Sequence, residues 1–230
     1  MAGVSRLQYS TEIRLIRVMC SGRVDLEFIL RAFSNGTDGV FIGGCRLNEC
    51  NYITHGNYGA LSNVLLCKKI MEHIGLNPER LRIEFLSSGD GNILAEVIND
   101  FCTKVEDIGP LGKSEGIDEK GLKFKLEAVT KLIPYLKLVE REKLRVSFNS
   151  VEEYNKFFTS DEVNRLFKEL IIDKLAISQI LLLLHEKPFS TGEMSDILGL
   201  NPSEVSRHMN SSSRHGLVRY DESRKRFALA

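Results

Sequence analysis

The sequence predicts a mixed α/β protein: a small domain of βαβ units with a parallel sheet, then an all-α linker, then a winged helix-turn-helix domain. In the first hundred residues, short β-branched segments alternate with amphipathic segments of helical spacing. Residues 110–121 are rich in Gly, Lys and Glu and lack apolar periodicity, which marks a boundary. The last seventy residues have the order helix, helix, turn, helix and hairpin. We therefore expect domains at residues 1–110 and 160–230, joined by a helical linker at 111–159.

The first domain is expected to contain three buried strands, at residues 13–19, 40–42 and 81–86, the second of which runs into Gly43, Gly44 and Cys45. Three helices are expected between and after them, at residues 24–33, 57–74 and 93–105. Asp25 and Glu27 open the first helix, and Gly75 ends the second. Strands separated by helices in this way indicate a parallel sheet with right-handed crossovers.

The linker and the last domain carry strong local signals. Residues 122–142 have helical spacing that Pro134 should divide, and Ser150 with Glu153 forms a capping box before another short helix. A long apolar helix is expected at residues 161–184. A helix capped by Ser190 and one capped by Asn201 follow it. Two short strands, at 217–220 and 226–229, complete the winged helix-turn-helix.

The composition excludes several classes of function. Lys and Arg number 31 and Asp and Glu number 31, so no bulk charge commits the protein to nucleic acid or to an acidic membrane. No apolar run approaches the roughly 20 residues of a membrane span, and the amino terminus lacks an apolar signal core. We expect a cytoplasmic protein. No phosphate-binding glycine loop or nucleophile motif is present, which favours a non-catalytic role.

Five cysteines, all before residue 103, carry the chemistry of this sequence. Their odd number argues against a disulfide framework. Cys20 and Cys45 end the first two predicted strands, and Cys50 follows in the same loop as Cys45. Because the carboxyl ends of parallel strands meet at one edge of a sheet, we expect these three thiols to converge there. Cys67 and Cys102 lie in apolar helical stretches and are expected to pack in the core.

Three soft ligands in a glycine-rich setting favour zinc or an iron–sulfur cluster, whereas buried structural cysteines are the simpler alternative. Gly22 and Gly44 would let backbone N–H groups approach a cluster. Arg23 and Arg46 would moderate its negative charge or contact an acidic partner; ordinary exposed arginines are the alternative.

Several linked motifs resemble the delta subunit of methyl-viologen-reducing hydrogenase. The resemblance covers about residues 2–109, and the motifs that carry it are 18–25 (VMCSGRVD), 28–33 (FILRAF), 38–45 (DGVFIGGC), 50–53 (CNYI), 56–58 (GNY) and 77–82 (NPERLR). It implies a [2Fe–2S] protein that relays electrons between a hydrogenase or formate dehydrogenase and a heterodisulfide-reductase-like flavoprotein. On that basis Cys20, Cys45 and Cys50 are carried over as cluster ligands, with Gly22, Arg23 and Gly44 beside the cofactor.

The sequence departs from this family at one point. Members usually have a C-x-x-C pair just upstream of the segment that matches residues 2–6, and here that pair is missing. A [2Fe–2S] cluster takes four ligands, so this chain as written lacks the fourth. Either the cluster is lost, or His55 or a neighbouring chain supplies the ligand, or Met1 is not the true start. We favour the last account, in which an upstream selenocysteine codon is mistaken for a stop.

The predicted recognition helix of the winged domain presents Arg207, Asn210 and Arg214, residue types suited to reading base edges or to contacting a protein partner. From residue 176 onward there are seven Lys or Arg and six Asp or Glu, a net charge of one. So small a charge favours docking to protein over binding to nucleic acid.

These observations predict an electron-transfer iron–sulfur subunit that a winged helix anchors to its complex. A redox-responsive winged-helix transcription regulator and a scaffold protein with structural zinc are the alternatives.

Overall fold

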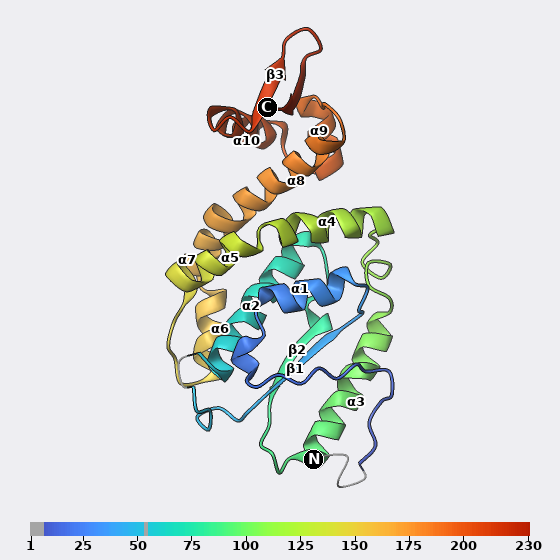
Figure 1. Cartoon of the computed structure of the whole chain (residues 1–230), viewed down its shortest axis with the longest axis vertical. Helices are drawn as coiled ribbons and strands as arrows, with labels where there is room; N and C mark the ends of the chain where they lie inside the picture. Colours follow the sequence, from blue (N-terminus) through green and yellow to red (C-terminus); the bar gives the residue numbers. More distant parts are fainter. Residues whose placement is uncertain (1–6, 53–54) are drawn as a thin grey trace.

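The protein is a mixed α/β chain in which a small parallel sheet, a helical middle and a carboxy-terminal winged helix follow one another (Figure 1). The computed structural model describes residues 7–52 and 55–230. The elements up to residue 108 are η1 (Ser21–Arg23), α1 (Leu26–Ser34), β1 (Val40–Gly44), α2 (Asn57–Ile74), η2 (Pro78–Arg80), β2 (Leu81–Phe85) and α3 (Gly91–Ile108). The remaining elements are α4 (Glu119–Lys131), α5 (Ile133–Val139), η3 (Glu140–Leu144), α6 (Val151–Thr159), α7 (Asp161–Leu166), η4 (Phe167–Ile172), α8 (Asp173–Glu186), α9 (Thr191–Leu198), α10 (Pro202–Arg214), β3 (Val218–Asp221) and β4 (Arg226–Leu229).

The sheet of the first domain pairs β1 with β2 in parallel, from Val40 opposite Leu81 to Gly44 opposite Phe85. Helix α2 connects the two strands, as a parallel pair requires. The predicted helix boundaries are close to those found. The Asp25 carboxylate accepts from the N–H of Glu27 at 2.9 Å, and Gly75 ends α2 with a positive φ of 83°.

The prediction of a strand at residues 13–19 is wrong: this segment belongs to no helix or sheet in the described part of the chain. Its side chains explain the difference. Leu15 and Ile16 are neighbours, so in a strand they would point to opposite faces, yet both are almost fully exposed. No face of the segment is buried, and β-propensity alone does not create a strand. Cys20 therefore ends no strand; it is the residue before η1.

The predicted linker packs into the same apolar core as the first domain. One cluster of buried side chains extends from Leu26 to Leu182 and includes residues of α4, α5, α6 and α8. The break expected near Pro134 occurs at Leu132, between α4 and α5. The expected capping box of α6 forms in part: Ser150 Oγ accepts from Glu153 N–H, and the Glu153 carboxylate accepts from Asn149 N–H. The helices from 119 to 159 are thus part of a continuous body.

The winged helix-turn-helix is present as predicted. Helices α8, α9 and α10 are followed by the antiparallel pair of β3 and β4. The predicted capping box forms at Ser190, and the predicted cap Asn201 also forms a capping box, with Glu204. Its core is a second cluster, which includes Ile180, Met194 and Met209. The Phe124 ring of α4 packs against both clusters, and Ser178 Oγ donates to the carbonyl of Ala128 at 2.9 Å. Helix α8 therefore joins the winged domain directly to α4.

Within the described ranges, no helix has the length and apolarity needed to cross a membrane.

Candidate functional site

The three cysteines predicted to act together lie around the amino-terminal end of α2. Cys20 precedes η1, Cys45 directly follows β1, and Cys50 lies in the loop that leads to α2. Cys50 is buried, Cys20 is half-buried and Cys45 is exposed, and none is in a disulfide. Figure 1 shows this loop at the end of the molecule that lies opposite the winged helix.

The thiol of Cys50 interacts with the thiols of both Cys45 and Cys20. Burial raises the pKa of Cys50, but hydrogen bonds from the backbone N–H groups of Asn57 and Tyr52 and the two neighbouring thiols outweigh burial, so its pKa lies below the ordinary value. For Cys45, local burial and the adjacent Cys50 raise the pKa to about 11. Two neighbouring thiols thus have pKa values shifted in opposite directions, and the thiolate is the form that binds metal.

Asn57, the first residue of α2, organises the loop and was not singled out from the sequence as a site residue. It is fully buried, and its Nδ2 donates to the carbonyls of Cys45 and Arg46, both at 2.9 Å. The same nitrogen lies 3.8 Å from Cys45 Sγ. One amide thus holds the loop after β1 against the start of α2. The sequence signal that could have identified Asn57 as a site residue is its position in the 56–58 motif, which directly follows the cysteine loop.

Two glycines allow close approach at this site. A Cβ on Gly56 would lie 2.2 Å from Cys50 Sγ, and a Cβ on Gly22 would lie 1.9 Å from the carbonyl oxygen of His55. Both are distances that no side chain tolerates. Gly44, the last residue of β1, is half-buried, and a Cβ there would lie 3.0 Å from Ser21 Oγ. The glycines predicted to lie beside the cofactor therefore pack η1, β1 and the loop together.

The helical linker covers one side of the cysteine loop. Tyr58 Oη donates to the carbonyl of Asn149 at 2.5 Å, and the Tyr58 ring stacks on Tyr154 with the centroids 5.4 Å apart. Arg145 Nη1 lies 3.3 Å from Nε2 of His55. His55, the predicted alternative ligand, therefore faces the linker, and its role as a ligand stays a prediction. These contacts join residues about 90 positions apart.

The two arginines near the cysteines have different surroundings. Arg46 forms a bidentate ion pair with Asp90: its Nη2 lies 2.8 Å from Oδ1 and its Nε lies 3.0 Å from Oδ2. This pair connects the cysteine loop to the turn before α3. Arg23 is exposed at the end of η1. Arg23 is therefore the better placed of the two to contact a partner.

The donor set suits a soft metal or an iron–sulfur cluster, because it consists of three thiols, one of them with a lowered pKa and backbone N–H groups beside it. Within residues 7–52 and 55–230, however, no three His, Cys, Asp or Glu side chains are arranged as a metal site. The cysteines are grouped, but they do not form a complete preformed centre. Cys67 is fully buried in α2, where burial raises its pKa to about 12, which fits the predicted packing role; Cys102 is half-buried in α3.

In the winged domain, Arg207, Asn210 and Arg214 are all exposed on α10, as the recognition-helix prediction requires. Arg207 Nη2 lies 3.0 Å from Asp173 Oδ1, so this guanidinium turns back toward α8. The buried His208 lies 3.8 Å from the same carboxylate. Asn210 and Arg214 make no ion pair or side-chain hydrogen bond within the described part of the chain.

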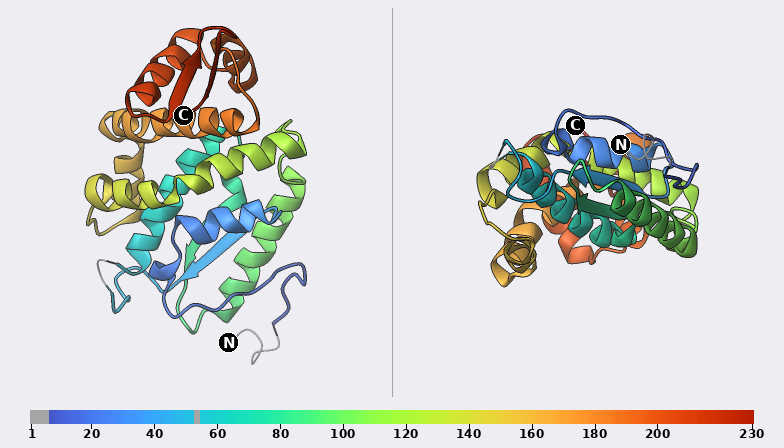
Figure 2. Two further views of the ribbon diagram at one scale, coloured as in Figure 1. Left: turned by 45° about the horizontal axis from the view of Figure 1, so that its top comes forward. Right: turned by 90° about the horizontal axis from the view of Figure 1, so that it is seen from below.

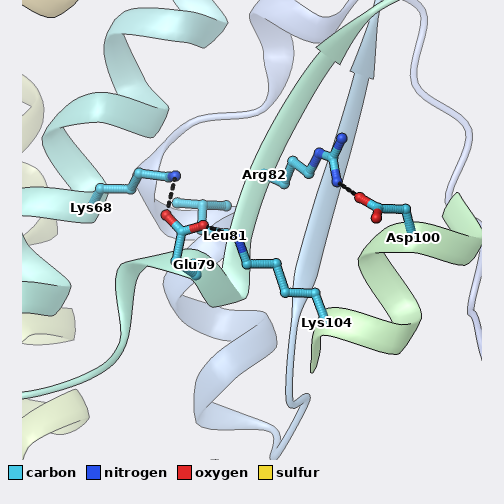
Figure 3. Close-up of a pocket in the computed structure, with 6 residues that line it drawn as sticks. All are labelled: Lys68, Glu79, Leu81, Arg82, Asp100 and Lys104. Atoms are coloured by element: carbon cyan, nitrogen blue, oxygen red, sulfur yellow. Dashed lines mark hydrogen bonds and ion pairs between the residues drawn. The ribbon is translucent and has the colours of Figure 1, made fainter. Parts of the chain in front are cut away.

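A charged hollow between α2, β2 and α3 differs in its chemistry from the cysteine site (Figure 3). Its side chains are paired with one another: Glu79 contacts Lys68 and Lys104, and Arg82 contacts Asp100. Arg82 also pairs with Glu84, so three cations face three carboxylates and every charge of the hollow has a partner within the chain.

Comparison with known proteins adds two family matches. Residues 1–109 match the family described as methyl-viologen-reducing hydrogenase, delta subunit. Residues 178–220 match the bacterial regulatory protein, arsR family, a helix-turn-helix family.

Curated relatives match the first half of the chain. The iron-sulfur subunit of an F420-non-reducing hydrogenase from Archaeoglobus profundus is 44% identical over 110 residues, which are 48% of this chain and 80% of that protein. The vhc iron-sulfur subunit of the corresponding hydrogenase from Methanococcus voltae is 42% identical over 121 residues, 51% of this chain and 83% of that protein. One subunit of the ferredoxin/F420H2-dependent CoB-CoM heterodisulfide reductase from Methanosarcina acetivorans is 46% identical over 112 residues, 49% of this chain but only 14% of that protein.

Proposed function

Because the chain belongs to the methyl-viologen-reducing hydrogenase delta-subunit family, we propose that it is a cytoplasmic, non-catalytic electron-transfer subunit with a [2Fe–2S] cluster bound by Cys20, Cys45 and Cys50. Its partners are a hydrogenase or formate dehydrogenase and a heterodisulfide-reductase-like flavoprotein. The names of the relatives support this, since they are iron-sulfur subunits of hydrogenases and subunits of heterodisulfide reductases.

The observation that carries the proposal is the mutual interaction of the three thiols beside the start of α2. A cluster bound there replaces the protons of the thiols, and the lowered pKa of Cys50 favours that exchange. The N–H groups of Asn57 and Tyr52 would donate to its sulfur atoms and help to set its reduction potential. A one-electron carrier needs no further catalytic group.

The test is metal analysis of the chain purified without oxygen. We expect about two iron and two sulfide per chain, and a low-temperature electron paramagnetic resonance signal after reduction. Cys20→Ala, Cys45→Ala and Cys50→Ala should each lose the signal, whereas Cys102→Ala, in α3, should keep it. Stoichiometric zinc without iron would replace the proposal with a structural metal site.

The same preparations test the fourth ligand. If His55→Ala loses the signal, this supports the imidazole as the ligand; if it keeps the signal, His55 is not the fourth ligand.

A redox-responsive transcription regulator is the second candidate, because residues 178–220 match a family of regulatory proteins and α10 exposes Asn210 and Arg214. Salt-dependent DNA binding that changes with the oxidation state of the cysteine site would favour it over the relay.

A further inference from the structure

Residues 13–19, the strap, expose an unusual amount of apolar surface. The side chains of Leu15, Ile16 and Met19 are 78%, 79% and 95% exposed, and Val18 is 37% exposed. Single exposed apolar residues are ordinary, but four within five positions are the kind of patch that marks an interaction site.

The strap is held at both ends and unpaired between them. The backbone N–H of Ser10 donates to Asn99 Oδ1 of α3 at 2.8 Å, and at the other end the carbonyl of Cys20 accepts from Arg23 N–H at 3.0 Å. None of the backbone hydrogen bonds found among the described residues involves the strap itself. Figures 1 and 2 show it as an extended trace across the end of the molecule that carries the cysteine loop. Its backbone groups are thus available to another chain.

We propose that the strap is a docking strand that pairs with an open sheet edge on an acidic partner protein, and this rests on the proposed function, in which that partner is the flavoprotein of the relay. Pairing would satisfy the free N–H and C=O groups and bury the exposed apolar side chains. The β-branched and apolar composition of residues 13–19 suits a strand once a partner edge is present.

The positive charge of the strap and the residues after it favours an acidic partner. Residues 13–24 contain Arg14, Arg17 and Arg23 and no acidic residue. Two copies of the strap paired with each other would bring four arginines of residues 13–19 into one ribbon, with strands about 4.8 Å apart, which like-charge repulsion opposes. An acidic edge would instead attract them and speed association.

The strap lies next to the cysteine site in the chain. Cys20 directly follows the strap, and Arg23 is exposed three residues further on, so a partner bound to the strap lies beside the thiols. The winged helix lies at the other end of the molecule and stays accessible (Figure 1).

The test uses the full chain and the purified heterodisulfide reductase flavoprotein from the same organism. Hydrogen exchange should slow at residues 13–19 in the complex. Ile16→Asp should weaken binding by about tenfold or more, and Arg14→Glu with Arg17→Glu should weaken it most at low salt. Ile197→Asp and Arg219→Glu are matched controls on exposed residues of the winged domain and should change binding by less than about twofold.

The outcomes separate the two proposals. A complex in which residues 13–19 exchange as fast as in the free chain overturns the docking strand and leaves the relay intact. A chain that dimerises alone through a protected strap also overturns it. Absence of any complex, with an intact cluster signal in the chain, overturns both the partner and the strap.

Discussion

Gly56 separates the buried Cys50 thiol from the first turn of α2, and the absence of a side chain there is what allows the sulfur to lie so close to the backbone. Asn57, the next residue, holds the loop of Cys45 with two hydrogen bonds from one amide. At this scale the cysteine site depends as much on these two uncharged neighbours as on the thiols.

We predict that Gly56→Ala disrupts the site. Its Cβ would lie 2.2 Å from Cys50 Sγ, so loop and helix must separate, at a cost of about 1–3 kcal/mol, and iron content should fall severalfold. Gly59→Ala is the control: nothing lies within 4 Å of its Cβ, and alanine in a helix should add about 0.5–1 kcal/mol. Urea unfolding and iron analysis measure both. Equal iron in the two variants would contradict the role of Gly56.

The elements of the first domain are joined by a buried ion pair. The guanidinium of Arg80, at the end of η2, is fully buried and contacts Glu115 at 2.6 Å. It also donates to the carbonyls of Asp38, before β1, and of Gly109 and Pro110, after α3. One side chain thus fastens the start of both strands to the segment that leads into α4.

We predict that Glu115→Gln costs about 3–5 kcal/mol at pH 7, because it leaves the buried Arg80 cation without its counter-charge. Burial raises the pKa of Glu115, but Arg80 and the N–H groups of Asn77 and Gly112 outweigh burial and lower it. The stability from ionised Glu115 is therefore fully present above its unfolded pKa, near 4.5, and is lost as pH falls through the lower folded value.

Urea unfolding between pH 7 and pH 3 tests this. The gap in stability between the parent and Glu115→Gln should narrow as the pH falls below 4.5. Glu106→Gln, on the exposed side of α3, should stay close to the parent throughout. If the stability difference between the parent and Glu115→Gln does not change with pH, the Arg80–Glu115 ion pair is not the cause of that difference.

At the scale of the whole molecule, the cysteine loop and the strap lie at one end and α10 at the other (Figures 1 and 2). The first core, from Leu26 to Leu182, and the contact of α8 with α4 connect them. A partner can therefore occupy the end with the cysteine loop while the winged helix contacts something else. Tyr58 of α2 stacks on Tyr154 of α6, and Lys69 of α2 contacts Asn164 of α7, so α2 connects the cysteine end to the helices that lead to α8.

We predict that DNA binding by the chain is weak and independent of the cysteine site. Residues 176–230 have a net charge of only one, and the winged helix lies at the opposite end of the molecule from the loop between β1 and α2 (Figure 1). In gel shifts at several salt concentrations, Cys50→Ala should change DNA affinity by less than about twofold, whereas Arg214→Glu should abolish whatever binding is present. A change of about tenfold or more in Cys50→Ala would favour the regulator over the relay.

Most of the helices were predictable, because their signals are local. Asp25, Ser190 and Asn201 cap helices from within three residues of their targets, and Gly75 ends α2 where the sequence indicated. The assignment of Cys20, Cys45 and Cys50 to one site stays a prediction, and one of its two reasons was wrong: Cys20 lies directly before η1 and not at the end of a strand.

Periodicity and capping residues were sufficient to indicate most helices and the winged domain, because these depend on residues a few positions apart. Folding in three dimensions lowers the pKa of Cys50 and raises that of Cys45, leaves residues 13–19 outside every sheet of the described part of the chain, and lets Arg80 and Asn57 hold distant segments together. Those outcomes depend on contacts between residues far apart in the chain, and on the burial that such contacts create. A pattern of neighbouring residues in the sequence indicates neither these distant contacts nor the burial that they create.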